Sequence, residues 1–145
     1  MEVVMAYHFE YDPDLCILLV VVEGEINQDD IFSYHEEIKT KLDSHKVKAA
    51  ITDLSGVEKS DLPSHMVWEL ASRDALLLRK VPRIIVAPQS YLYGMARMYQ
   101  LSANIPSELL EIVHTRDEAL AAMGAKNARF QRLKPPEGRA KFSSA

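Results

Sequence analysis

Polar side chains that are able to do chemistry are concentrated between residues 53 and 65. The set consists of Asp53, Ser55, Ser60, Asp61, Ser64 and His65. One arrangement of them would be a hydrolase, with Ser64 as nucleophile, His65 as base and an aspartate as the orienting acid. We rank that interpretation last, because three neighbours in sequence seldom converge on one reacting atom. Two interpretations remain: turn and helix-capping chemistry, and a loop that recognises a partner or is phosphorylated.

The rest of the sequence offers no pattern for catalysis or for a cofactor. The five glycines are scattered, so neither the phosphate loop nor the dinucleotide fingerprint is present. There is no Gly-x-Ser-x-Gly elbow, and the histidines lack the spacing of a metal site. We therefore expect a protein that is not an enzyme and that needs neither metal nor cofactor.

Length, composition and charge favour one domain. The chain has 145 residues with 48% hydrophobic and 26% charged residues, which is ordinary for a globular domain. It contains no apolar run long enough for a membrane span, and its start does not resemble a signal peptide, so we expect a cytoplasmic protein. The net charge of −4 opposes binding to nucleic acid. The single thiol, Cys16, lies in an apolar run and is expected to be buried.

The elements that position these residues alternate between strand and helix. Apolar runs predict strands over residues 3–9, 15–22, 47–54, 84–86 and 110–114. Helical spacing and capping residues predict helices that begin after Asn27, after Ser60 or Asp61, near Gln89 and after Thr115. Residues 55–61 are expected to form a loop at the carboxyl end of the third strand. The order β-β-α-β-α-β-α-β-α predicts an α/β domain whose mixed, mostly parallel sheet has about five strands and about four helices.

The domain is expected to end at Gly124. Residues 125–145 carry six basic residues and one acid, so the end of the chain is basic while the rest is acidic. We expect this basic stretch to be a flexible tail. Phe130, Leu133 and Phe142 are apolar residues that would allow it to dock on the domain.

The second and third predicted helices carry more apolar surface than packing on a sheet requires. The large apolar residues concerned are Trp68, Tyr91, Met95, Met98 and Tyr99. Three explanations remain open. The helices are covered within the monomer, they contact a protein partner or a second copy in a homodimer, or they enclose an apolar ligand or a membrane-facing groove.

One motif in this sequence resembles a known family. The run Asp-Leu-Ser-Gly-Val at residues 53–57, followed by Asp61, resembles the signature of STAS domains, the fold of sporulation anti-sigma-factor antagonists. The resemblance extends over about Val3 to Gly124 in the order of elements. In that family a serine after the aspartate is phosphorylated by partner kinases, but here that position is Pro63, and neither Ser60 nor Ser64 is in register. The chain therefore looks more like the divergent SpoIIAA-like branch, which is similar in architecture to lipid-carrying CRAL-TRIO domains.

The resemblance implies a non-catalytic regulatory or protein-interaction module. Its recognition surface would be the Asp53–His65 stretch together with the second helix. The alternative is a carrier or sensor of an apolar, lipid-like ligand, with membrane association at most peripheral. The carrier would use the large apolar residues of the second and third helices.

Overall fold

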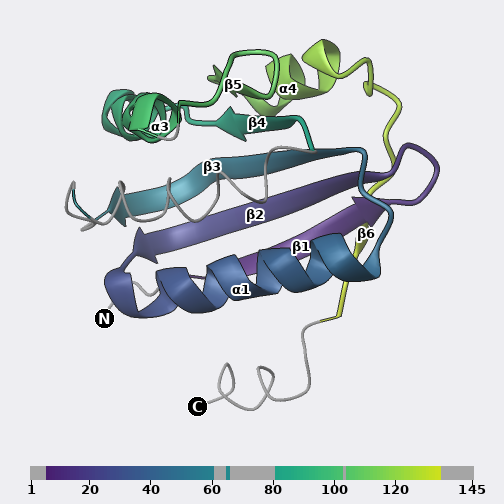
Figure 1. The fold of residues 1–145 in the computed structure, drawn as a ribbon, viewed down its shortest axis with the longest axis horizontal. Helices are drawn as coiled ribbons and strands as arrows, with labels where there is room; N and C mark the ends of the chain where they lie inside the picture. Colours follow the sequence, from purple (N-terminus) through teal and green to yellow (C-terminus); the bar gives the residue numbers. More distant parts are fainter. Residues whose placement is uncertain (1–5, 61–64, 66–80, 103, 135–145) are drawn as a thin grey trace.

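The protein is an α/β domain with one mixed β-sheet and helices on both faces of that sheet (Figure 1). A computed structural model describes residues 6–60, 65, 81–102 and 104–134. The sheet has six strands in the order β5-β4-β3-β2-β1-β6. The strands are β1 (Ala6–Asp12), β2 (Ile17–Ile26), β3 (Ala49–Ser60), β4 (Arg83–Val86), β5 (Leu110–Val113) and β6 (Gln131–Arg132). The described helices are α1 (Gln28–Ser44), α3 (Ser90–Ser102) and α4 (Arg116–Ala122).

The sheet combines an antiparallel hairpin with a parallel half. β1 and β2 are antiparallel, and Asp12 pairs with Ile17 next to the turn between them. Strands β2, β3, β4 and β5 pair parallel to one another. This architecture confirms the predicted α/β fold class, with one more strand than expected.

Strand β2 is buried on both faces and divides the core into two clusters. Leu18, Val20 and Val22 belong to the cluster that α1 and α3 cover. Ile17, Leu19 and Val21 belong to the cluster that α4 covers. The alternation follows from the two-residue period of a strand, and it explains why an uninterrupted apolar run occurs here.

Helix α1 forms where the sequence predicts it and packs on the sheet with one apolar side. Tyr34, Ile38 and Leu42 contact the first core cluster, and Figure 1 shows the helix lying along one face of β1 and β2. The fourth and fifth strands and the third helix also form within a residue or two of their predicted ranges. Thr115 caps α4 as expected, since its side chain accepts a hydrogen bond from the Glu118 backbone N–H at 3.1 Å.

The prediction of a loop at residues 55–61 is wrong for residues 55–60, which belong to strand β3. Strand β2 continues past Val22 to Ile26, so β3 keeps a hydrogen-bonding neighbour: Glu23 pairs with Gly56, and Ile26 pairs with Ser60. Register shifts between Val21 and Glu23 and between Gly24 and Glu25 accommodate the irregular backbone. The polar sequence of this stretch has no strand pattern of its own, and its pairing comes from the neighbouring strand.

Residues 125–134, expected as the start of a flexible tail, pack against the sheet. Gln131 pairs with Tyr11 in β1, and the Leu133 backbone N–H donates to the Phe9 carbonyl oxygen at 2.8 Å. Ala125 is buried, and Phe130 packs against the second core cluster. This segment adds the sixth strand, which the sequence did not predict because β6 is only two residues long. The remainder of the expected tail, residues 135–145, lies outside the described residues.

The second predicted helix lies outside the described residues, apart from His65, which is helical and exposed. Cys16 is buried at the turn between β1 and β2, as expected. Among the described helices, none is long and apolar enough to span a membrane.

Candidate functional site

Asp53 lies at the carboxyl end of the parallel half of the sheet. It pairs with Val21 of β2 on one side and Val86 of β4 on the other, and Val86 pairs with Val113 of β5. Four strands therefore reach the same edge at this level. In open α/β sheets, ligands and partners commonly bind at this edge, because the connections that follow the strands gather there.

The buried Asp53 carboxylate organises its surroundings. One oxygen, Oδ1, accepts hydrogen bonds from the Ser55 backbone N–H at 2.9 Å and from the Ser55 hydroxyl at 2.5 Å. The other, Oδ2, accepts one from Arg116 Nε at 2.7 Å. Asp53 is only 3% exposed, and these contacts satisfy a charge that would otherwise be costly to bury. The carboxylate therefore joins the ends of β3 and β5 through the start of α4.

Beyond Asp53, strand β3 presents a row of exposed side chains. Ser55, Glu58 and Lys59 are exposed, while Val57 between them is 1% exposed and anchors the strand in the core. The Gln89 side chain adds a second anchor by donating to the Val57 carbonyl oxygen at 3.2 Å. We call Ser55, Glu58 and Lys59 the edge surface.

Gly56 lets β2 and β3 stay close at this point. A Cβ atom on Gly56 would lie 2.7 Å from the Cγ of Glu23 and 3.3 Å from its Cβ. The Glu23 side chain therefore occupies the space that any larger residue would need. Gly56 belongs to the motif that resembles STAS domains. The close approach of Glu23 explains why this position of the motif holds a glycine here.

The predicted site residues of this stretch separate into buried and exposed groups. Asp53 is buried, Ser55 and His65 are exposed, and Ser60 is half-buried. The predicted residues Asp61, Ser64 and Trp68 lie outside the described residues.

Helix α3 divides the other predicted residues between its two sides. Tyr99 is 8% exposed, and the Arg83 guanidinium lies over its ring, 5.2 Å from the ring centre. Met95 and Met98 are half-buried against the first core cluster, whereas Tyr91 is 43% exposed. The apolar excess of the third predicted helix is thus partly core and partly surface.

Arg116 is a residue of this edge that the sequence did not predict. It lies 63 positions from Asp53 in the sequence, and only the pairing of β3, β4 and β5 brings the two together. Its position after the fifth predicted strand was the available signal, because parallel strands end at one edge. Tyr93 and His114, whose rings stack with centres 4.7 Å apart, were missed for the same reason.

A separate cavity lies at the opposite ends of the parallel strands. It has a volume of about 400 Å³ and is lined by the starts of β2, β3 and β4, by residues near β5, and by the end of α4. The residues predicted for an apolar ligand that the structure describes, Tyr91, Met95, Met98 and Tyr99, do not line it. Within the described residues, no group of His, Cys, Asp and Glu side chains is placed to hold a metal ion.

These features define a protein with the SpoIIAA-like fold, the fold of the STAS class. One sheet holds the motif at residues 53–57, the parallel strands that end beside it and the antiparallel β1. The fold inferred from the resemblance is therefore confirmed.

Three solved structures are similar over most of their length. The anti-sigma factor antagonist SpoIIAA in its unphosphorylated form has a TM-score of 0.56 and 14% identity, over 82% of this chain and 96% of that one. An anti-sigma factor antagonist from Mycobacterium paratuberculosis has a TM-score of 0.56 and 22% identity, over 83% and 95%. An uncharacterised protein with a SpoIIAA-like fold from Shewanella loihica has a TM-score of 0.58 and 13% identity, over 85% and 96%. No family model and no curated protein matches the sequence.

Proposed function

We propose that this protein is a non-catalytic regulatory module that binds a protein partner through the edge surface. The observation that carries the proposal is the exposed end of β3. Ser55, Glu58 and Lys59 lie on a strand that is held in the sheet by Val57 and by pairing with β2. A partner would therefore meet charged and hydroxyl groups at fixed positions.

The rigidity of this strand favours recognition. Asp53 fixes Ser55 through two hydrogen bonds, and Gln89 fixes the backbone at Val57. Groups that are already ordered lose little conformational entropy on binding, so more of the contact energy is available for affinity. The contacts of Asp53 oppose a catalytic role, because one of its oxygens accepts hydrogen bonds from Ser55 and the other accepts one from Arg116 of α4.

The similar structures support a proposal for the class of partner. Two of them are named as anti-sigma factor antagonists, which act on an anti-sigma factor. We propose a partner of the same kind here, a regulatory protein of the anti-sigma-factor class. Phosphorylation of Ser60 or Ser64 would be a way to regulate this binding, and the proposed binding does not depend on it.

A binding measurement with matched charge reversals tests the proposal. The test variant carries Glu58→Lys and Lys59→Glu, which keep the net charge but exchange two exposed groups of the edge surface. The control carries Lys48→Glu and Glu108→Lys, which do the same at the cavity end of the sheet. Each purified protein is titrated by calorimetry against the anti-sigma-factor proteins of the source organism.

We expect one of these proteins to bind, and the test variant to weaken its binding about tenfold, which is about 1.4 kcal/mol. The control should bind within about twofold of the unchanged protein, because its exchanged charges lie at the opposite end of the sheet from the proposed interface. Binding by none of the candidates, or equal weakening by both variants, would contradict the proposal.

The alternative function, a carrier or sensor of an apolar ligand, stays a prediction. Tyr99 and the half-buried Met95 and Met98 contribute to the first core cluster, so they already have apolar neighbours. Trp68 lies outside the described residues. We therefore place the protein-interaction module first.

A further inference from the structure

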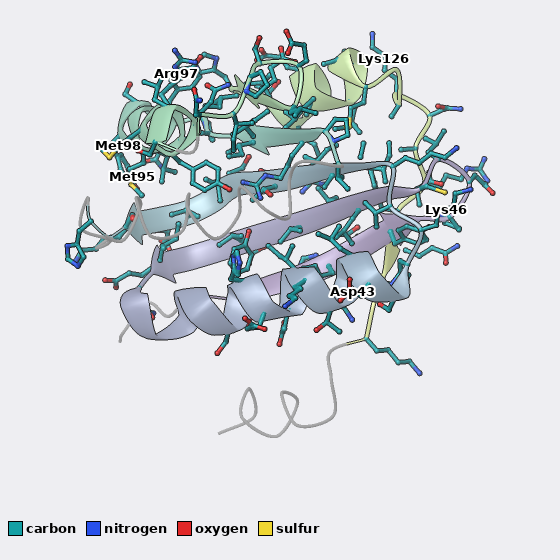
Figure 2. All side chains as sticks on the ribbon, in the orientation of Figure 1. Asp43, Lys46, Met95, Arg97, Met98 and Lys126 are labelled. Atoms are coloured by element: carbon teal, nitrogen blue, oxygen red, sulfur yellow. The ribbon has the colours of Figure 1, made fainter. Side chains whose placement is uncertain are left out.

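A basic surface lies at the cavity end of the sheet and continues along β6. Two segments that are far apart in sequence contribute to it, the one before β3 and the one after α4. Figure 2 shows Lys46 of the first segment and Lys126 of the second at the same end of the molecule. The exposed basic residues of this surface, which we call the basic face, are Lys46, Lys48, Lys126, Arg129, Arg132 and Lys134.

Backbone contacts at the turn between β1 and β2 hold the two segments together. The Lys48 backbone N–H donates to the Cys16 carbonyl oxygen at 2.8 Å. On the other side of the same turn, the Asp12 carboxylate accepts the Arg129 backbone N–H at 2.8 Å. Strand β6 then carries Arg132 along the edge of β1. The backbone is therefore fixed, while the basic side chains stay exposed.

The charges of the basic face are not neutralised within the described part of the chain. None of its six side chains forms an ion pair there, whereas Lys59 and Arg116 at the other end of the sheet each contact a carboxylate. The exposed acids on the β1 side of the cavity end are Asp14 and Asp43. Two further acids, Glu108 and Glu111, lie beside β5 at the far edge of the sheet. The basic face thus carries a net positive charge.

The acidic charge is concentrated at the opposite end of the strands. Exposed acids near the carboxyl ends of β2 and β3 and at the start of α4 are Glu23, Glu58, Asp117 and Glu118. Strand β3 has 12 residues, so at about 3.3 Å per residue it separates the two ends by about 40 Å. Salt screens charges beyond about 8 Å at physiological concentration. A planar anionic surface would therefore attract the basic face without repelling the acidic end.

Apolar side chains lie among the basic ones. Leu15, Met123 and Phe130 are half-buried, and they come from the same turn and the same segment after α4. The cavity of about 400 Å³ opens beside them, lined in part by Leu15, Met123 and Lys48. Basic groups around apolar ones suit a layer of anionic headgroups above an apolar interior. A nucleic acid would offer phosphates but no apolar layer, so the composition favours lipid.

We propose that the basic face binds peripherally to an anionic lipid surface. A basic side chain close to such a surface raises the affinity about fivefold, and the attraction weakens as salt is added. In this orientation the edge surface lies at the end of the sheet away from the lipid, where a partner can reach it. The proposal does not depend on the identity of that partner.

Co-sedimentation of the full chain with lipid vesicles tests the proposal. The vesicles contain phosphatidylcholine alone, or phosphatidylcholine with about one-third phosphatidylserine. The test variants are Lys126→Glu and Arg129→Glu. Both residues are exposed, and the hydrogen bond of Arg129 to Asp12 uses its backbone, so neither change should lower the melting temperature. The matched control, Arg97→Glu, makes the same change of charge on α3, at the other end of the view in Figure 2.

We expect the protein to bind the anionic vesicles about tenfold more tightly than the neutral ones at low salt, and to be released at high salt. Each test variant should bind the anionic vesicles about fivefold more weakly, and the control within about twofold of the unchanged protein. No preference for anionic vesicles, or an equal loss in the control, would overturn the proposal. So would displacement by inorganic phosphate beyond that by chloride at equal ionic strength, which would indicate a site for a small anion. Tighter binding to duplex DNA than to the anionic vesicles would also overturn it. No partner protein is present, so this test and the partner test fail independently.

Discussion

Two buried aspartates show how single residues position the ends of the sheet. Asp53 joins β3 to α4, and Asp12 joins the turn between β1 and β2 to the segment that leads into β6. Both are 3% exposed, and both accept backbone N–H groups as well as, for Asp53, an arginine. A buried carboxylate with several donors is a strong local tie.

The Asp12 tie should make the stability of the protein depend on pH. The Arg129 backbone N–H, with those of Leu15 and Asp14, holds the pKa of the Asp12 carboxyl below its usual value. A lowered pKa stabilises the folded state above the pKa of the unfolded chain, about 3.9, and this stability is lost as the pH falls towards the folded pKa. Chemical denaturation between about pH 6 and 3 should show the decline.

The variant Asp12→Asn isolates this contribution. An amide nitrogen cannot accept the Arg129 N–H, so the variant should be less stable at neutral pH and should decline less steeply as the pH falls. The two stability curves should converge at low pH. Parallel curves would mean that Asp12 does not cause the dependence.

Gly56 is a second residue whose role can be measured. A methyl group there would lie 2.7 Å from the Glu23 Cγ, so Gly56→Ala should lower the free energy of unfolding by about 1–3 kcal/mol. The double variant Gly56→Ala with Glu23→Ala removes that Cγ and should recover much of the loss. No recovery in the double variant would place the strain in the backbone instead.

At the scale of elements, the sequence predicts those parts whose apolar pattern is local. The apolar run 15–22, helix α1 after Asn27 and the Thr115 cap are each specified by neighbouring residues, and each forms as expected. The extension of β3 and the pairing of β6 were not predicted. Their sequences are polar, and they are held by residues far away in the chain, such as Glu23 and Phe9.

The segment at residues 125–134 should be part of the folding unit. A chain that ends at Gly124 loses the burial of Ala125 and the contacts of Phe130 and Leu133, together with the Arg129 bond to Asp12. We expect its free energy of unfolding to fall by roughly 3 kcal/mol or more relative to a chain that ends at Lys134.

Urea denaturation of the two shortened chains gives the comparison. If the shorter chain does not fold, Leu133→Ala in the full chain should still lower the stability, by roughly 1–2 kcal/mol. Equal stability of the chains that end at Gly124 and at Lys134 would show that the segment only lies on the surface.

At the scale of the whole molecule, the two ends of the parallel strands differ in character. The carboxyl end carries the edge surface, tied by Asp53 and Arg116, while the opposite end carries the cavity of about 400 Å³. The sequence predicted the first location through its motif, but the contribution of Arg116 required the order of the strands.

In the proposed function, the SpoIIAA-like fold is the scaffold, and the exposed end of β3 is the surface that the partner would contact.

Hydrogen–deuterium exchange of the complex with the proposed anti-sigma-factor partner tests the central claim most directly. Peptides that cover residues 54–60 should exchange more slowly in the complex than in the free protein, because the partner covers the exposed end of β3. Peptides at the cavity end, around residues 82–84 and 107–111, should exchange at unchanged rates. Protection confined to the cavity end, with residues 54–60 unaffected, would contradict the account.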